Sequence, residues 1–172
     1  HNTIDYDHNL NNEIVEREKN EGTDARFLAN DNGLPFLVNM TEKLLVTLLA
    51  KLINFIPGGG IWMNTQRPEW NDANNALVGN GVSMVTLYYL RRYVNFLKKF
   101  ISEFSDSNVN VSVEVFMLFS EINRNFVTHK NSLNGSISDA TRKSILDGVG
   151  HAGSRYRDKI YNFGFSGQKK NI

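Results

Sequence analysis

The sequence predicts an all-α protein in which successive helices form antiparallel hairpins. Apolar residues recur at helical spacing in several separate stretches, whereas alternation of apolar and polar residues never extends beyond a few positions. The chain has 172 residues, of which 41% are hydrophobic and 22% charged. This length and composition are sufficient for one globular domain with a hydrophobic core.

The N-terminal segment, residues 1–34, is predicted to be polar and partly irregular. Its acidic side chains are interleaved with asparagines, and it contains few large apolar residues. A short helix is expected near residues 12–19, followed by extended or irregular chain up to a turn at Asn32-Gly33. We expect a helical domain over residues 35–163 and a flexible polar tail over residues 164–172.

The first long helix is predicted to begin near Thr41. Adjacent pairs of large apolar residues repeat every four positions from Leu44 to Ile53, which places them on one side of a helix. Asn39 is the expected N-cap, and Glu42, three residues later, is its expected capping-box partner. Pro57 and the three glycines after it end the helix.

Two further helices are predicted over residues 82–104 and 112–128. The first carries an apolar stripe close to heptad spacing, formed by Met84, Leu87, Leu90, Val94, Leu97, Ile101 and Phe104. The second begins with Ser112 as its cap and has Glu114 in its first turn, where a negative charge complements the helix dipole. Residues 109–113 alternate in polarity, but this run is short and leads into the helix.

The fourth predicted helix covers residues 139–146 and begins after Ser138, its expected cap. Three glycines then interrupt the helical pattern, at Gly148, Gly150 and Gly153. A separate final helical segment is expected near residues 155–162.

Charge and composition disfavour several classes of partner. The formal net charge of +1 offers no electrostatic basis for binding nucleic acid or an anionic membrane. The longest apolar run, residues 44–56, is interrupted by polar side chains and is too short to span a bilayer. The chain has no cysteine, and its four histidines lack metal-ligand spacing. We therefore predict no cofactor, no metal, no nucleic acid and no membrane partner, and the redox compartment stays open.

The segment from Gly58 to Asn75 contains aromatic, acidic and hydrogen-bonding side chains that a connecting loop does not need. It begins with a triple glycine and holds both tryptophans of the chain among hydrogen-bonding side chains and two acids. In a sugar-binding cleft an indole stacks on the apolar face of the ring, while amide, guanidinium and carboxylate groups bind its hydroxyls. The candidate binding residues are Gln66, Arg67, Glu69, Trp70, Asn71 and Asn74.

Asp72 is the candidate catalytic residue. An indole beside a carboxyl desolvates the charged form and raises its pKa, which keeps an acid protonated for donation to a leaving group. In the alternative interpretation, Asp72 caps a helix that starts at Ala73, and Trp70 is a core anchor. Arg67 is equally compatible with a surface ion pair.

Glu69-Trp70-Asn71-Asp72 resembles the Asp-Trp-Asn-Asp loop of the cellobiose and chitobiose phosphorylase family, and more broadly of the (α/α)6-toroid glycoside-processing enzymes. The resemblance implies that Asp72 is the general acid that protonates the glycosidic oxygen and that Trp70 lines a sugar subsite. It also implies a partial (α/α) toroid-like bundle, an oligosaccharide substrate and, in a phosphorylase, inorganic phosphate as co-substrate. The sequence departs from the family's loop in two respects. Glu69 replaces the first aspartate, and residues 57–66 have no counterpart in the loop.

A complete toroid requires more helices than this chain supplies, and the chain begins with His1 instead of methionine. We therefore expect this chain to be a segment of a longer polypeptide. The remainder of that polypeptide is its expected partner, and the segment by itself is expected to be inactive. The alternative function is a non-catalytic helical module that binds glycan or protein through residues 58–75. A purely structural helical bundle is the third hypothesis.

Overall fold

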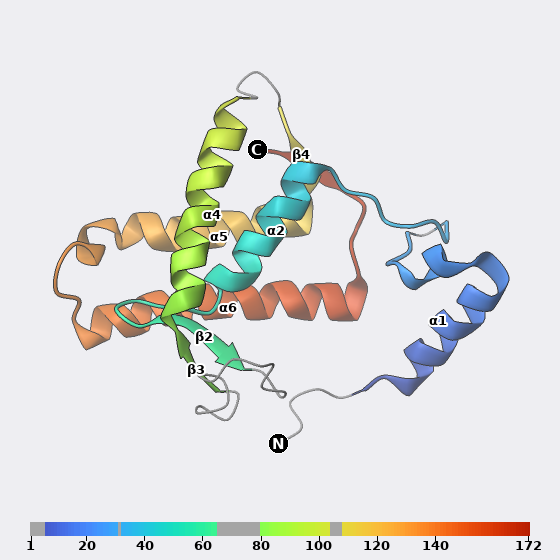
Figure 1. The fold of residues 1–172 in the computed structure, drawn as a ribbon, viewed down its shortest axis with the longest axis horizontal. Coiled ribbons are helices and arrows are strands. Elements are labelled where there is room, and N and C mark those ends of the chain that lie inside the picture. The colour runs from blue at the N-terminus through green and yellow to red at the C-terminus, as the bar shows by residue number, and fades with distance from the viewer. Residues whose placement is uncertain (1–5, 31, 65–79, 104–107) are drawn as a thin grey trace. The chain divides into compact units, whose positions relative to one another are not determined.

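The structure, a computed structural model, describes residues 6–30, 32–64, 80–103 and 108–172. Within these ranges the chain is mostly helical, with five α-helices and two small antiparallel sheets (Figure 1). The predicted predominance of helix is confirmed, but the class is not purely all-α. No helix in the described part of the chain is both long enough and apolar enough to cross a membrane.

The chain divides into two compact units, His1–Val38 and Asn39–Ile172. In the first unit, α1 spans His8–Glu21, longer than the short helix predicted, and a 3₁₀-helix follows at Thr23–Arg26. Asp7 caps α1 by accepting a hydrogen bond from the Leu10 amide at 2.9 Å. No side chain of α1 is buried.

The second unit contains α2 (Met40–Leu52), α4 (Met84–Ser102), α5 (Val113–Thr128) and α6 (Asp139–Phe163). Helices α5 and α6 lie side by side, and α2 and α4 cross them (Figure 1). The core forms where α2, α5 and α6 meet and comprises Leu49, Val115, Leu118, Ile122 and Ala152. As predicted, Asn39 caps α2 by accepting from the Glu42 amide at 2.8 Å, and Ser138 caps α6 by accepting from the Thr141 amide at 3.2 Å.

The glycines of the last helix do not interrupt it, which corrects the prediction of two separate segments. Helix α6 runs unbroken through 25 residues. A Cβ on Gly153 would lie 2.8 Å from the Ile53 side chain, and one on Gly148 would overlap the Asn125 amide. These two glycines therefore allow close approach of neighbouring elements, and tertiary packing outweighs the low helix propensity of glycine.

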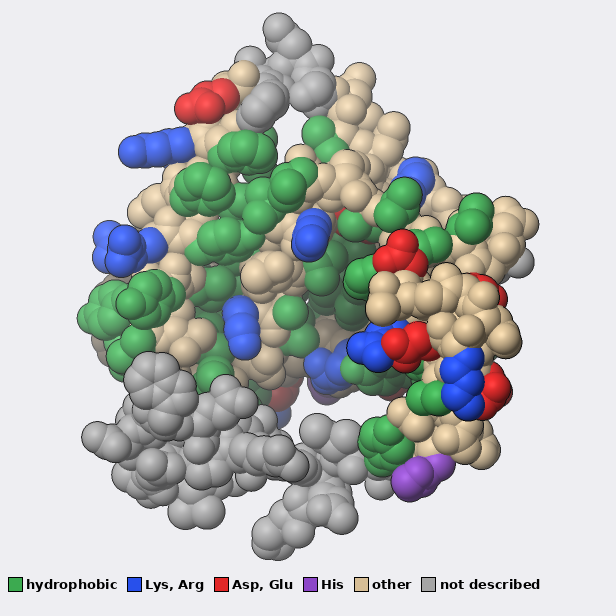
Figure 2. Space-filling view, turned by 45° about the vertical axis from the view of Figure 1, so that its right-hand side comes forward, with side chains coloured by type: hydrophobic (Ala, Val, Ile, Leu, Met, Phe, Trp, Pro, Cys, Tyr) green, Lys and Arg blue, Asp and Glu red, His purple; other side chains and the backbone are tan. Residues whose placement is uncertain are grey.

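Helix α4 buries less of its apolar stripe than predicted. Leu90 and Leu97 are buried, whereas Met84, Val94 and Ile101 are exposed. Further large apolar side chains on α4 also face solvent: Val85, Tyr88, Tyr89 and Phe96. Figure 2 shows apolar side chains over α4, interspersed with Lys and Arg.

The C-terminal segment is a strand, not the flexible tail that the sequence predicts. Strand β5 (Lys169–Asn171) pairs antiparallel with β4 (Asn110–Ser112), with Val111 opposite Lys170. The amide of Ile172 also donates to the carbonyl of Val109 at 3.0 Å. The short alternating run that precedes α5 is therefore the pairing partner of the chain's last residues.

Candidate functional site

Strands at both ends of the Gly58–Asn75 region form a small antiparallel sheet. Strand β1 (Phe55–Ile56) pairs with β2 (Gly60–Asn64), which pairs with β3 (Asn80–Ser83). Asn64 is the register partner of Asn80, so the two ends of residues 65–79 are neighbours across one ladder. Strand β2 thus occupies part of the Gly58–Asn75 region, where the sequence predicts no strand.

All seven predicted site residues lie outside the described residues. They are the candidate acid Asp72 and the candidate sugar-binding residues Gln66, Arg67, Glu69, Trp70, Asn71 and Asn74. The structure describes the strands from which this segment departs and to which it returns. The roles assigned to these seven residues remain predictions.

The triple glycine has a defined role in building the sheet. Gly58, with a φ of 74°, lies in the turn between β1 and β2, where the Gly59 amide donates to the Ile56 carbonyl at 3.0 Å. Gly60 has a φ of 152°, and a Cβ there would lie 2.8 Å from the Ser83 carbonyl oxygen. A side chain at Gly60 would therefore separate β2 from β3.

The sheet is fixed to the protein interior. Ile61 of β2 and Pro57 of the preceding turn are fully buried. Ser83 ends β3 and caps α4 by accepting from the Thr86 amide at 3.1 Å, so no linker separates β3 from the helix. Residues 65–79 are consequently connected at one end to β2, whose Ile61 is buried, and at the other to β3, which continues directly into α4.

Trp62 is a described residue on this sheet to which the sequence analysis assigns no role of its own. Its side chain is 44% exposed, and its amide donates to the Asn54 carbonyl at 2.8 Å. Trp62 is the register partner of Val82 in β3, whose side chain is also exposed. An indole exposed to this extent leaves part of an aromatic face open to solvent. The sequence signal that could have identified Trp62 is its position within the Gly58–Asn75 region.

Two buried carboxylates form a second polar region, which the sequence analysis did not predict. Glu42, expected as a capping-box partner, is 1% exposed, and its Oε2 accepts from the Ser112 amide at 3.0 Å and from Lys169 Nζ at 3.2 Å. Lys169 also donates to Ser112 Oγ at 2.9 Å. The Ser112 side chain therefore binds the C-terminal strand instead of capping α5. These partners are far from Glu42 in sequence, so no local pattern indicates them.

Glu114 anchors the same C-terminal segment from the first turn of α5. Its Oε1 accepts from the Ser166 amide at 3.1 Å and lies 3.8 Å from Lys159 Nζ, while its side chain is fully buried. Burial by itself would raise the pKa of Glu114, but the hydrogen bonds from Ser166, the Glu114 backbone and the charge of Lys159 together hold this pKa below its ordinary value of 4.5.

Acid should therefore weaken the fold through Glu114. A carboxyl with a depressed folded-state pKa stabilises the protein above its unfolded pKa, and this contribution is lost as pH falls through the folded-state pKa. We expect the free energy of unfolding to fall as the pH drops below the ordinary carboxyl pKa of 4.5, and to fall less in Glu114→Gln. Urea titrations at a series of pH values measure both slopes. Equal slopes would show that Glu114 does not couple folding to pH.

The described residues show no metal centre. Within them, no group of three or more His, Cys, Asp or Glu side chains lies close enough to hold an ion. His129 Nδ1 lies 2.9 Å from the Asn125 carbonyl and Nε2 lies 3.1 Å from Ser144 Oγ. Because a carbonyl oxygen only accepts, Nδ1 carries the hydrogen, and Nε2 of the neutral ring accepts from Ser144.

Comparison of the chain with protein-family models and with curated proteins gives no match.

Proposed function

We propose that this chain is the acid-bearing segment of a carbohydrate-active enzyme, resembling glycoside phosphorylases or hydrolases, and that Asp72 protonates the glycosidic oxygen. The observation that supports this most directly is the pairing of Asn64 with Asn80, which brings the two ends of the Asp72 segment together. Buried Ile61 and the cap at Ser83 hold the ladder against the helical body. Catalytic groups are commonly carried by loops on such rigid elements.

In the proposed mechanism, Asp72 donates its proton as the bond to the leaving group breaks. Trp70 stacks against the sugar ring, and Gln66, Arg67, Asn71 and Asn74 bind hydroxyls. Inverting hydrolysis needs a second carboxyl about 6.5–9.5 Å away to activate water, and Glu69 is the neighbouring carboxyl. With inorganic phosphate as the nucleophile, that second carboxyl is not required.

The finer architecture that we propose is a partial (α/α) toroid of antiparallel hairpins. Helices α5 and α6, which lie side by side, are one such hairpin in this proposal (Figure 1). The exposed apolar side chains of α4 are consistent with a helix that packs against further hairpins. The remainder of a longer polypeptide would supply those hairpins.

Sugar binding can be tested with the two tryptophans as separate reporters, since the chain has no others. Trp62→Phe leaves Trp70 as the reporter, and Trp70→Phe leaves Trp62. We expect titration with cellobiose to change the emission of Trp62→Phe and to leave a much weaker response in Trp70→Phe, because the stacking indole is missing. A response carried by Trp62 alone would place the sugar on the sheet and contradict the role given to Trp70.

Asp72→Asn distinguishes an enzyme from the alternative, a non-catalytic module that binds glycan or protein through residues 58–75. General acid catalysis contributes about 10²–10⁴-fold, so turnover of a glycoside by the complete polypeptide that we propose should fall by that factor while affinity for cellobiose is retained. The loss should be smaller for a dinitrophenyl glycoside, whose leaving group departs without protonation. Asp158→Asn, an exposed position on α6, is the matched control. Equal loss of affinity and turnover would favour the binding module.

A further inference from the structure

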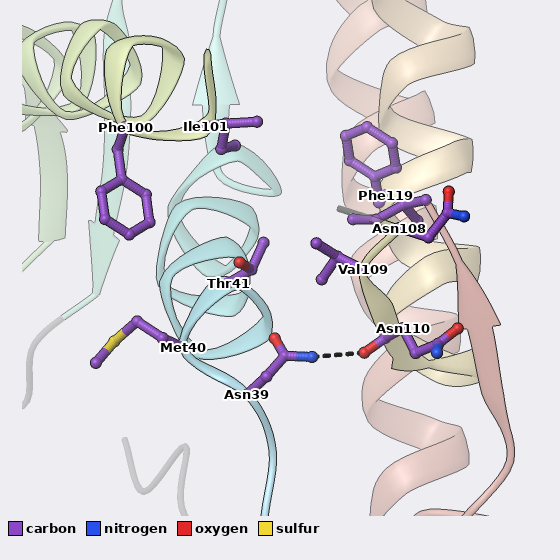
Figure 3. Close-up of a pocket in the computed structure, with 10 residues that line it drawn as sticks. Asn39, Met40, Thr41, Phe100, Ile101, Asn108, Val109, Asn110 and Phe119 are labelled. Carbon is purple, nitrogen blue, oxygen red and sulfur yellow. Dashed lines mark hydrogen bonds between the residues drawn. The ribbon is translucent and has the colours of Figure 1, made fainter. Parts of the chain in front are cut away.

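An apolar pocket opens between the N-terminal end of α2 and the C-terminal end of α4 (Figure 3). It has a volume of about 760 Å³ and lies entirely within the second unit. Small-molecule sites in proteins typically enclose about 300–1,000 Å³ and are lined mainly by apolar side chains. The apolar side chains that line this pocket are Met40, Phe100, Ile101, Val109, Phe119 and Ile172.

The pocket continues into the interface between α2 and α4. A smaller hollow of about 100 Å³ shares Phe100, Ile101 and Phe119 with it and reaches Leu44, Leu45 and Leu97. Leu97 is 7% exposed, so this inner end approaches the protein core. An apolar cavity of about 150 Å³ binds benzene, so the inner end, at about 100 Å³, accepts a smaller group such as a short alkyl chain.

The described side chains at the rim of the pocket are polar and uncharged. They are Asn39, Thr41, Asn108 and Asn110, and among the described residues no Lys, Arg, Asp, Glu or His side chain lines either hollow. Asn39 is already engaged, because its Nδ2 donates to the Asn110 carbonyl at 2.6 Å while its Oδ1 caps α2 (Figure 3). A charged head group held here would lose water without gaining a counter-ion, so a neutral ligand is favoured.

The mouth of the pocket exposes apolar surface that a ligand would cover. Met40 is 62% exposed, Ile101 51% and Ile172 41%. Removing apolar surface from water favours binding, so an alkyl group gains most of its affinity from these side chains and the inner end.

We propose that this pocket binds a small neutral amphiphile. Its short alkyl group occupies the inner end formed by Leu44, Leu45 and Leu97, and its hydroxyl or amide head meets Asn108 and Asn110 at the rim. Binding at this pocket does not depend on Asp72 as an acid.

The test compares three ligands that share one tail: 1-octanol, octanoate and octylammonium. Binding is followed by NMR of methyl-labelled protein through the methyl signals of Ile101, Val109 and Ile172, with exposed Val127 on α5 as the internal control. We expect saturable shifts with 1-octanol at the three pocket positions and at least tenfold weaker binding of both charged ligands. A tenfold difference corresponds to about 1.4 kcal/mol.

Two variants locate the ligand. Leu97→Phe fills the inner end and should weaken 1-octanol binding at least tenfold. Ile101→Lys places a cation at the exposed mouth and should strengthen octanoate binding, whereas Val127→Lys, a matched change away from the pocket, should not. If Leu97→Phe does not fold, the methyl shifts and the response of octanoate to Ile101→Lys still decide the question.

Several outcomes would overturn the proposal. The first is the absence of saturable shifts up to the solubility limit of 1-octanol, and the second is equal affinity for the three ligands. A third is a concentration-dependent dimer in sedimentation experiments whose formation protects Ile101 and Ile172, which would assign the pocket to a second copy of the chain.

Discussion

Replacing Glu42 with alanine should lower the free energy of unfolding by about 3 kcal/mol. Glu42 is 1% exposed and accepts from the buried Ser112 amide and from Lys169. Its removal leaves the buried Ser112 N–H without this acceptor and takes one partner away from Lys169. Because the Lys169 side chain is 35% exposed, solvent screens its charge, and the expected loss of stability lies at the lower end of the range for buried ion pairs.

Two comparisons separate the charge of Glu42 from its hydrogen bonds. Glu42→Gln retains an acceptor oxygen for the Ser112 amide and should cost less than Glu42→Ala. Glu121→Ala removes a pair with Arg155 on the surface and should cost less than about 1 kcal/mol. Urea denaturation at neutral pH measures all three. If Glu42→Ala costs no more than Glu121→Ala, the buried carboxylate does not hold the C-terminal strand.

Adding one methyl group to helix α6 should have opposite effects at two glycines. Gly153→Ala is expected to destabilise the protein by about 1–3 kcal/mol, because the new Cβ would lie 2.8 Å from the Ile53 side chain. Gly150→Ala should stabilise it by about 0.5–1 kcal/mol, since no atom lies within 4 Å of the new Cβ and alanine favours helix. Thermal and urea denaturation of the two variants measure the difference.

The contact with Ile53 can be tested directly by a double variant. Ile53→Ala removes the atoms that a Cβ at Gly153 would meet, so Gly153→Ala should cost less in the Ile53→Ala background than in the wild type. Equal costs in both backgrounds would mean that another contact limits this position. A Gly153→Ala protein as stable as Gly150→Ala would contradict the close approach of α6 to Ile53.

Features that depend on neighbouring residues were predictable from the sequence. The helices follow from apolar spacing, and the caps at Asn39 and Ser138 follow from side chains that reach an amide three residues away. The prediction of a cap failed at Ser112, where the side-chain oxygen accepts from Lys169, 57 residues along the chain. A local pattern identifies a hydrogen-bonding group but not a competing partner that is distant in sequence.

The candidate site was also only partly predictable from local sequence. Composition identifies the Gly58–Asn75 region and its candidate acid, Asp72, but not the strands that hold the region's ends. Strands β2 and β3 are short, and their stability depends on the close approach at Gly60 and the burial of Ile61, both of which need the folded chain. The roles of Asp72 and Trp70 rest on the sequence resemblance and await the experiments above.

The sequence by itself determined that this protein is mainly helical, because helix formation is encoded in spacings of three and four residues. Only the tertiary structure decided that α6 continues through Gly148 and Gly153 and that the last residues form a strand. It also decided that Glu42 and Glu114 are buried anchors for the C-terminal segment. The physical reason is distance along the chain: these features depend on contacts between residues far apart in sequence, where burial and pairing outweigh local propensity.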